Sequence, residues 1–264
     1  MSNGTPTMQQ AAFAGDNPDP EKASQTYVDE VPIMGLSDNH MELDESRPGV
    51  ASDGTDGLNA TAKNLKAFVQ SVADNGGYYI ARYEASYGSG SSTADWKPLS
   101  KVSTGTPRTS SSTPLTQGML WNYLTQLDAS KISQNMYPTE DTIVGVESDL
   151  INSYAWDTAI VFIQSMNEAN SNYANAGREE TGNSSLMNTG ETGDKVCNIF
   201  DMAANVIEWT TEYSTLKGGS SASPCTHRGG NCYGSYGICT ASRNCNTATC
   251  SLSSCGFRVA LYVK

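Results

Sequence analysis

The end of the chain lacks acidic residues, because neither Asp nor Glu occurs after Glu212. Calcium-dependent sugar binding normally draws on carboxylates in the binding loop. The missing side chains therefore exclude that mode of binding for this stretch. A sugar bound here would be held by tyrosine stacking and neutral hydrogen bonds, and a protein ligand is an equal alternative.

Metal and thiol-redox motifs are also missing. The chain has seven cysteines but no C-x-x-C pair, and its two histidines are His40 and His227. Zinc sites need closely spaced Cys and His ligands, so we expect no zinc site.

Neither a signal peptide nor a membrane span is predicted. Residues 1–15 lack the basic and apolar regions of a signal peptide, and no apolar run is long enough to cross a bilayer. We therefore expect synthesis into a cytoplasm, where thiols stay reduced, and no membrane insertion.

The formal net charge of −12 is concentrated in residues 1–57, which hold eleven carboxylates against Lys22 and Arg47. The remaining net charge of −3 argues against a nucleic-acid partner for residues 58–264. Residues 1–57 thus predict an acidic N-terminal arm or tail outside the core. Within it, Tyr27–Leu36 is the one segment with enough apolar residues to pack against another surface. A disordered tail and an arm that becomes ordered on a larger assembly or a neighbouring subunit are both open.

Residues 58–264 predict a single domain that mixes helices and strands. Apolar spacing predicts helices over residues 58–77, 113–130 and 149–167, and β-rich runs predict strands over 78–86 and 256–263. We expect the two strands to pair, which would bring the ends of the domain together.

Three pieces of this domain together resemble one family. They are GGYYIARYEAS (76–86), NIFDMAANVIEWTTEY (198–213), and RGG (228–230) followed by SR (242–243) and GFRVAL (256–261). They resemble the formylglycine-generating-enzyme, or sulfatase-modifying factor, domain. The resemblance implies an α+β fold that is a variant of the C-type lectin fold. The middle piece departs from the family pattern at Ala204, usually Gly, and at Ile207, usually Trp.

The enzyme branch of that family oxidises a sulfatase cysteine, using two cysteines shortly after the Gly-Gly and copper as cofactor. Here Cys232 and Cys239 follow Gly229 and Gly230, but the basic, aromatic-rich run around the enzyme's cysteine pair is missing. We therefore expect no enzyme activity. A copper-dependent formylglycine-generating oxidase acting on a sulfatase cysteine is the alternative.

The better match is to the variable target proteins of diversity-generating retroelements. The resemblance implies a fixed lectin-like scaffold whose C-terminal segment is rewritten by adenine-directed mutagenesis, which does not produce Lys, Glu, Gln, Met or Trp. None of these five occurs over residues 218–263, which predicts a variable region at about 218–255. The same mutagenesis would explain the six cysteines from Cys225 to Cys255 as products of altered codons, and we expect most of them to be free thiols. A disulfide framework is the alternative.

This resemblance predicts a ligand-binding surface on the variable region. Tyrosine supplies broad contact area, while Ser, Asn and Gly adapt to different ligands. The candidate contact residues are His227, Cys232, Tyr233, Ser235, Tyr236, Ile238, Asn244, Cys245, Asn246, Leu252 and Ser253.

A structural calcium ion is a second expectation from the family. The positions that match its calcium ligands are Asn205 and Glu208, which supply the oxygen donors that calcium prefers. The alternative is that Glu208 caps or hydrogen-bonds the loop, which Ala204 makes stiffer than glycine would.

The expected function is receptor or ligand binding, with a protein or glycan on a host or neighbouring cell as partner. We expect a phage tail or a bacterial cell surface as the location, with the N-terminal arm attached to that assembly. A purely structural virion protein is a third hypothesis.

Overall fold

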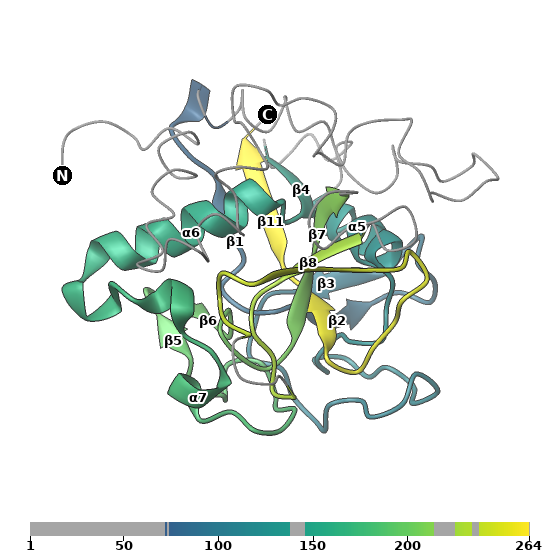
Figure 1. Cartoon of the computed structure of the whole chain (residues 1–264). Helices are drawn as coiled ribbons and strands as arrows, with labels where there is room; N and C mark the ends of the chain where they lie inside the picture. The colour runs from purple at the N-terminus through teal and green to yellow at the C-terminus, as the bar shows by residue number, and fades with distance from the viewer. Residues whose placement is uncertain (1–71, 73, 138–145, 214–224, 234–237, 264) are drawn as a thin grey trace.

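The computed structural model describes residues 72, 74–137, 146–213, 225–233 and 238–263. Within these residues the strands form two sheets and two short hairpins, shown in Figure 1. The first sheet is antiparallel in the order β1-β11-β4, with β1 at Tyr79–Ile80, β11 at Val259–Val263 and β4 at Val146–Leu150.

The second sheet has the order β10-β7-β8-β9. Its strands are β10 (Cys255–Phe257), β7 (Ile207–Tyr213), β8 (Cys225–Arg228) and β9 (Arg243–Asn246). The pair β10 and β7 is parallel, and the other pairs are antiparallel. The hairpins join β2 (Ser86–Ser89) to β3 (Lys97–Leu99) and β5 (Lys195–Val196) to β6 (Ile199–Phe200).

The predicted pairing between the two end strands is confirmed, with Tyr79 opposite Leu261 and Ile80 opposite Ala260. The early strand is shorter than predicted, although Ala81 still donates a backbone hydrogen bond to Val259. The helix predicted over 58–77 lies mostly outside the described residues. Its described end is helical at Asp74 and stops at Gly76, whose φ of 79° is left-handed.

Helix α6 spans Ser153–Met166 and confirms the helix predicted over 149–167. Asn152 caps it by accepting a hydrogen bond from the backbone N–H of Ala155. One face buries Trp156 and Ile163 against the core. After α6 come the 3-10 turns η2 (Glu168–Asn170) and η3 (Tyr173–Asn175) and the short helix α7 (Arg178–Thr181).

The helix predicted over 113–130 is wrong in position, because helix α5 spans Gln126–Gln134. The capping box of Thr125 and Asp128 sets its start. Residues 113–125 instead lie beside the early strand region, where Trp121 donates a backbone hydrogen bond to Ala85. Positive φ values at Gly118 and Tyr123 are incompatible with a continuous helix there.

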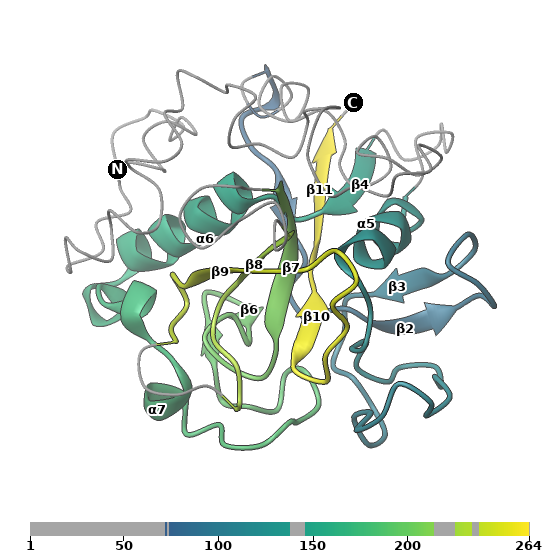
Figure 2. The ribbon, with the colours of Figure 1, turned by 45° about the vertical axis from the view of Figure 1, so that its right-hand side comes forward.

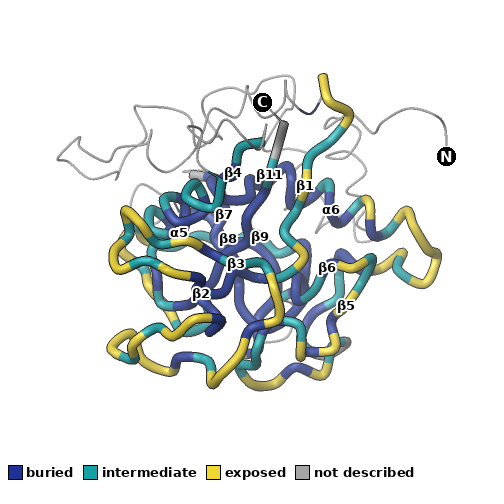
Figure 3. The backbone as a smooth tube through the Cα atoms, turned by 180° about the vertical axis from the view of Figure 1, so that it is seen from behind, coloured by how far each residue is buried: buried dark blue, intermediate teal, exposed yellow. Residues whose placement is uncertain are grey.

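Helices α5 and α6 lie to the two sides of β7 and β11 in Figure 2. The core consists of two clusters, one around α6 and Trp156 and the other around Trp121, Trp209 and Phe257. Figure 3 shows the buried backbone in the centre of the domain and the exposed backbone in the outer loops. None of the described helices is long and apolar enough to cross a membrane.

Candidate ligand-binding face

Much of the predicted variable region is part of the scaffold. Strand β8 lies between β7 and β9, and all four of its residues are buried. Strand β10 is buried as well and pairs with β7 through Gly256 opposite Glu208. The segment over residues 225–258 therefore contributes both core strands and the surface beside them.

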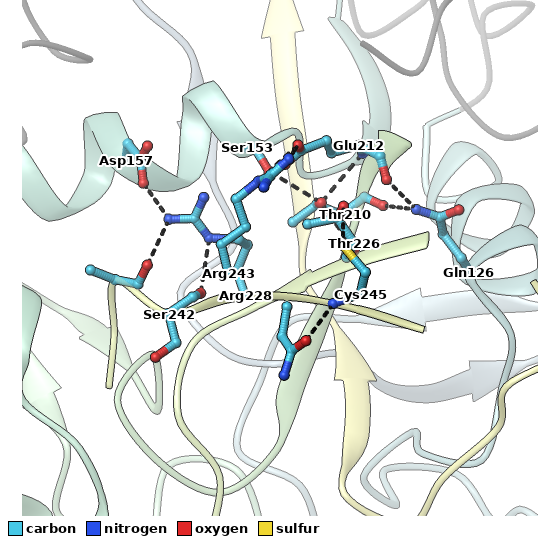
Figure 4. A network of polar contacts seen from close by, with 12 residues as sticks. Gln126, Ser153, Asp157, Thr210, Glu212, Thr226, Arg228, Ser242, Arg243 and Cys245 are labelled. Carbon is cyan, nitrogen blue, oxygen red and sulfur yellow. Dashed lines mark hydrogen bonds and ion pairs between the residues drawn. The ribbon is translucent and has the colours of Figure 1, made fainter. Parts of the chain in front are cut away.

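A buried ion pair ties β8 to helix α6. The guanidinium of Arg228 lies 2.6 Å from the carboxylate of Asp157 and also donates to the backbone carbonyls of Ala241 and Ser242. Figure 4 shows this arginine between the helix and the loop that precedes β9. Removing one partner of such a pair leaves a buried charge, which typically costs roughly 3–5 kcal/mol.

A second buried ion pair ties β9 to β7. The Nε of Arg243 donates to both carboxylate oxygens of Glu212, at 2.8 and 3.0 Å. The hydroxyl of Ser153 donates to the same carboxylate at 2.6 Å (Figure 4). Burial alone raises the pKa of Glu212, but the charge of Arg243 and these hydrogen bonds outweigh it and lower the pKa below its ordinary value.

Steric contacts explain the two glycines of the Arg-Gly-Gly sequence at residues 228–230. A Cβ atom on Gly230 would collide with the backbone carbonyl oxygen of Ala203. Gly229 has a φ of 83°, and a Cβ atom there would lie 2.7 Å from the carbonyl oxygen of Met202. Both positions therefore require glycine.

A groove of about 430 Å³ lies beside the face of β8 and β9, and we call it the β8–β9 groove. Five of the predicted contact residues line it: His227, Ile238, Asn244, Asn246 and Leu252. The other lining residues are Ile207, Gly229, Asn231, Cys239, Ala241, Ser242, Arg243 and Ser254. None of the lining residues is a carboxylate, and the charge of Arg243 is paired with Glu212.

The polar wall of the groove comes from alternate residues around β9. Ser242, Asn244 and Asn246 line the groove, as expected for side chains that point to one face of a strand, and Arg243 lines it as well while pairing with Glu212. Cys245 has the opposite orientation, and its sulfur lies 3.5 Å from the hydroxyl of Thr226. Cys245, which was predicted as a ligand contact, is half-buried and does not line the groove.

His227 forms part of the groove floor and is largely buried, with 7% exposure. Its ring packs edge-to-face on Trp209 at 5.5 Å between centroids. Burial, and then the nearby charge of Arg228, lower the pKa of His227 to about 4. The imidazole is therefore neutral at neutral pH and can serve as a hydrogen-bonding group.

The remaining predicted contact residues differ in how far their side chains are exposed. Tyr233 is 54% exposed and available to a ligand. Cys232 is fully buried and offers no surface, which corrects its prediction as a contact. Ser253 is half-buried beside the groove, and its carbonyl accepts a hydrogen bond from Asn122. Ser235 and Tyr236 lie outside the described residues.

Both predicted calcium ligands are fully buried and hydrogen-bonded to protein groups. The Nε of Arg258 donates to Glu208 Oε2 at 3.0 Å, and its terminal NH2 donates to Glu208 Oε1 at 2.7 Å. The amide oxygen of Asn205 accepts from the backbone N–H of Met187, and its amide nitrogen donates to Glu84. These two side chains do not fit a calcium ion, because their oxygens already accept protein hydrogen bonds.

The interior around Arg258 is rich in carboxylates. Burial, together with the charges of Asp201 and Glu208, raises the pKa of Glu84 well above its ordinary value. Burial also raises the pKa of Asp194 to about 6. No group of three or more His, Cys, Asp or Glu side chains suited to a metal ion occurs among the described residues.

Residues 140–263 match the family model described as the sulfatase-modifying factor enzyme 1-like domain. The match covers slightly less than half of the chain, and it shows that these residues are similar to that domain. The predicted α+β fold of the formylglycine-generating-enzyme type is thereby confirmed.

Two solved structures are similar to the chain. Treponema denticola variable protein 1 is 16% identical, with a TM-score of 0.36, over 69% of this chain and 94% of that chain. CarF is 19% identical, with a TM-score of 0.35, over 45% of this chain and 48% of that chain. The chain thus spans about half the length of CarF, and no curated protein matches it.

The cysteines that follow the Gly-Gly of this sulfatase-modifying factor-like domain are interior groups. Burial raises the pKa of the Cys232 thiol to about 11, and Cys239 is also buried. A reactive cysteine needs an exposed thiol with a lowered pKa. Cys232 has neither property in this structure.

Proposed function

We propose that the chain is a ligand-binding variable protein of a diversity-generating retroelement, and that its β8–β9 groove contacts the ligand. One observation carries the proposal: Lys, Glu, Gln, Met and Trp are absent throughout residues 218–263. This stretch supplies every residue that lines the groove except Ile207.

The chemistry of the groove supports a replaceable contact surface. Its wall presents short neutral side chains, such as Asn244 and Asn246, on a strand that the ion pair of Arg243 with Glu212 fixes in place. Exchanging an exposed side chain on a fixed strand changes the contact without moving the backbone. Ligands held here would meet amide and imidazole hydrogen-bonding groups together with the apolar side chains of Ile238 and Leu252.

A direct test is binding of the labelled full chain to a defined glycan array and to a panel of intact bacterial cells. We expect Asn244→Trp to fill the groove and abolish any binding that the native chain shows. Thr249→Trp is the matched control, because Thr249 is exposed and does not line the groove. Equal binding by both variants would place the contact elsewhere.

The retroelement part of the proposal has a separate test in the neighbouring DNA. We expect a near-copy of the final coding stretch that differs mainly at adenines and lies beside a reverse-transcriptase gene. Sequencing the surrounding DNA checks this, and a locus without such a copy would contradict the retroelement origin even if the groove binds a ligand.

A non-catalytic role is part of the proposal, and the buried, high-pKa thiol of Cys232 supports it. The test is incubation with copper and a sulfatase-type cysteine peptide, followed by mass spectrometry for formylglycine. We expect no turnover. Turnover that disappears in Cys232→Ser would establish the oxidase instead.

The setting that we propose is a phage tail or a bacterial cell surface, where a neutral groove of changeable composition would meet proteins or glycans of another cell. Immunogold labelling of virions and of intact cells tests this location. Labelling confined to the cell interior would contradict it.

A further inference from the structure

A second groove, of about 590 Å³, lies between the first sheet and the β2–β3 hairpin. We call it the β1–β3 groove, and Figure 3 shows β1, β3 and β11, which contribute to it, from behind. Its lining residues are Ile80, Ala81, Arg82, Gly88, Ser89, Lys97, Pro98, Leu99, Ser100, Gln117, Met136, Tyr137, Val259 and Leu261. None of them belongs to the proposed variable region of residues 218–255.

The β1–β3 groove combines an apolar wall with two cations. Ile80, Leu99 and Leu261 are only partly buried although all three are apolar. Arg82 and Lys97 are exposed at the groove, and no carboxylate lines it. Within the described part of the chain, neither cation forms an ion pair. The groove therefore suits an extended peptide that is apolar and acidic.

We propose that Tyr27–Leu36 of the chain's own N-terminal arm docks in the β1–β3 groove. This segment, YVDEVPIMGL, places the acidic pair Asp29 and Glu30 directly before the apolar residues Val31, Ile33 and Met34. The apolar side chains fill the groove, and the acidic pair faces Arg82 and Lys97. The opposite charges of arm and groove select this orientation.

The position of the arm in the chain supports docking within one molecule. The described chain begins at Val72 and reaches the groove at Ile80. The 35 residues between Leu36 and Val72 can span up to about 120 Å when extended, which is ample for reaching the groove. A tether of this kind keeps the segment at an effective concentration of roughly millimolar. Residues 1–26 remain available for attachment to an assembly.

Photocrosslinking of the full chain tests the proposal. The photoreactive residue p-benzoylphenylalanine replaces Tyr137 or Gln117, and both positions line the groove. An equal mixture of 14N- and 15N-labelled protein is irradiated and digested. We expect crosslinked peptides that contain residues 27–36, with both halves carrying the same isotope. The matched control places the same residue at Tyr233, which is exposed and does not line the β1–β3 groove, and should yield no crosslink to residues 27–36.

Other crosslinking results overturn the proposal. Mixed-isotope products would show that the arm of another copy occupies the groove. The absence of any crosslink to residues 27–36 from both positions would show that the segment does not dock there.

Charge reversal provides a second measurement. Arg82→Glu with Lys97→Glu should lower the yield of the crosslink to residues 27–36 by at least about threefold, as expected for two exposed charge pairs. Adding Asp29→Lys and Glu30→Lys should restore it. Both cations are exposed, so the variants should fold, and thermal unfolding checks this. A yield that charge reversal leaves unchanged would contradict the proposed orientation.

Discussion

Two sets of residues alternate within the same stretch, residues 225–258. The buried anchors are Arg228, Gly230, Arg243 and Arg258, and the groove rim consists of Ile238, Asn244, Asn246 and Leu252. The anchors connect the stretch to α6, β7 and the backbone near Ala203, whereas the rim lines the β8–β9 groove. One stretch can therefore be fixed in position and replaceable on its surface.

The difference between the two sets comes from burial of charge. Each anchoring arginine faces a carboxylate outside the stretch: Asp157, Glu212 or Glu208. A buried charge without its partner is costly, so these positions tolerate little change. The rim residues are partly or fully exposed, so exchange of a neutral side chain there costs little.

The largest expected effect is at Arg258, whose guanidinium contacts Glu208 and the carbonyls of Ala81 and Phe200. Arg258→Met should lower the free energy of unfolding by roughly 3–5 kcal/mol, because Glu208 loses its counter-charge. Urea unfolding measures this. Arg82→Met is the matched control at an exposed arginine and should change stability by less than about 0.5 kcal/mol. Similar effects of the two variants would contradict the assignment of Arg258 as an anchor.

A comparable loss is expected at the pair of Arg243 and Glu212. Arg243→Met should destabilise the domain, and Arg243→Met combined with Glu212→Met should recover part of the loss, because no lone charge is then buried. A double-mutant cycle by urea unfolding checks this, and purely additive effects would show that the pair is not coupled.

Acid should weaken the same pair. The folded pKa of Glu212 lies below its ordinary value of 4.5, so its stabilising contribution is present above that pH. It is lost as the pH falls through the lower, folded value. The loss should be absent from the Glu212→Met variant when unfolding is followed across the acid range.

A smaller effect, of opposite pH dependence, is expected at Asp194. Its pKa rises from 3.8 to about 6 in the folded chain, mainly through burial. The folded state therefore holds a proton that the unfolded state has released, and stability should fall by up to about 3 kcal/mol as the pH rises through this range. Asp194→Asn should remove that decline. An unchanged pH profile in the variant would contradict the raised pKa.

The smallest effect is expected at the rim. Asn244→Ala should change the free energy of unfolding by less than about 0.5 kcal/mol, because the side chain is exposed. Thermal unfolding measures this, and a loss comparable to that of Arg243→Met would remove the distinction between rim and anchors.

Parts of the fold could be predicted from local patterns. The apolar spacing after Asn152 predicts α6, and the β-rich runs around Ile80 and Ala260 predict the pairing of β1 with β11. The path through Gly118 and Tyr123 could not be predicted in this way. It depends on backbone hydrogen bonds to residues 85–87 and on positive φ values, which apolar spacing does not reveal.

The candidate site was predictable as a region but not residue by residue. The residue composition indicated the stretch over residues 218–255. The two-residue period of a strand would also have placed Ser242, Asn244 and Asn246 on one face and Cys245 on the other. The partners of the arginines are distant in sequence, as with Glu208 and Arg258, which lie 50 positions apart. Arg258 as the partner of Glu208 was therefore not predicted.

Saturation mutagenesis of residues 225–233 and 238–258, with a proteolysis-based stability measurement for every variant, tests the central claim most directly. Nearly all substitutions at Arg228, Gly230, Arg243 and Arg258 should destabilise the domain. Most substitutions at Ile238, Asn244, Asn246 and Leu252 should leave it folded. Equal tolerance of the two sets would contradict the division of this stretch into buried anchors and a replaceable rim.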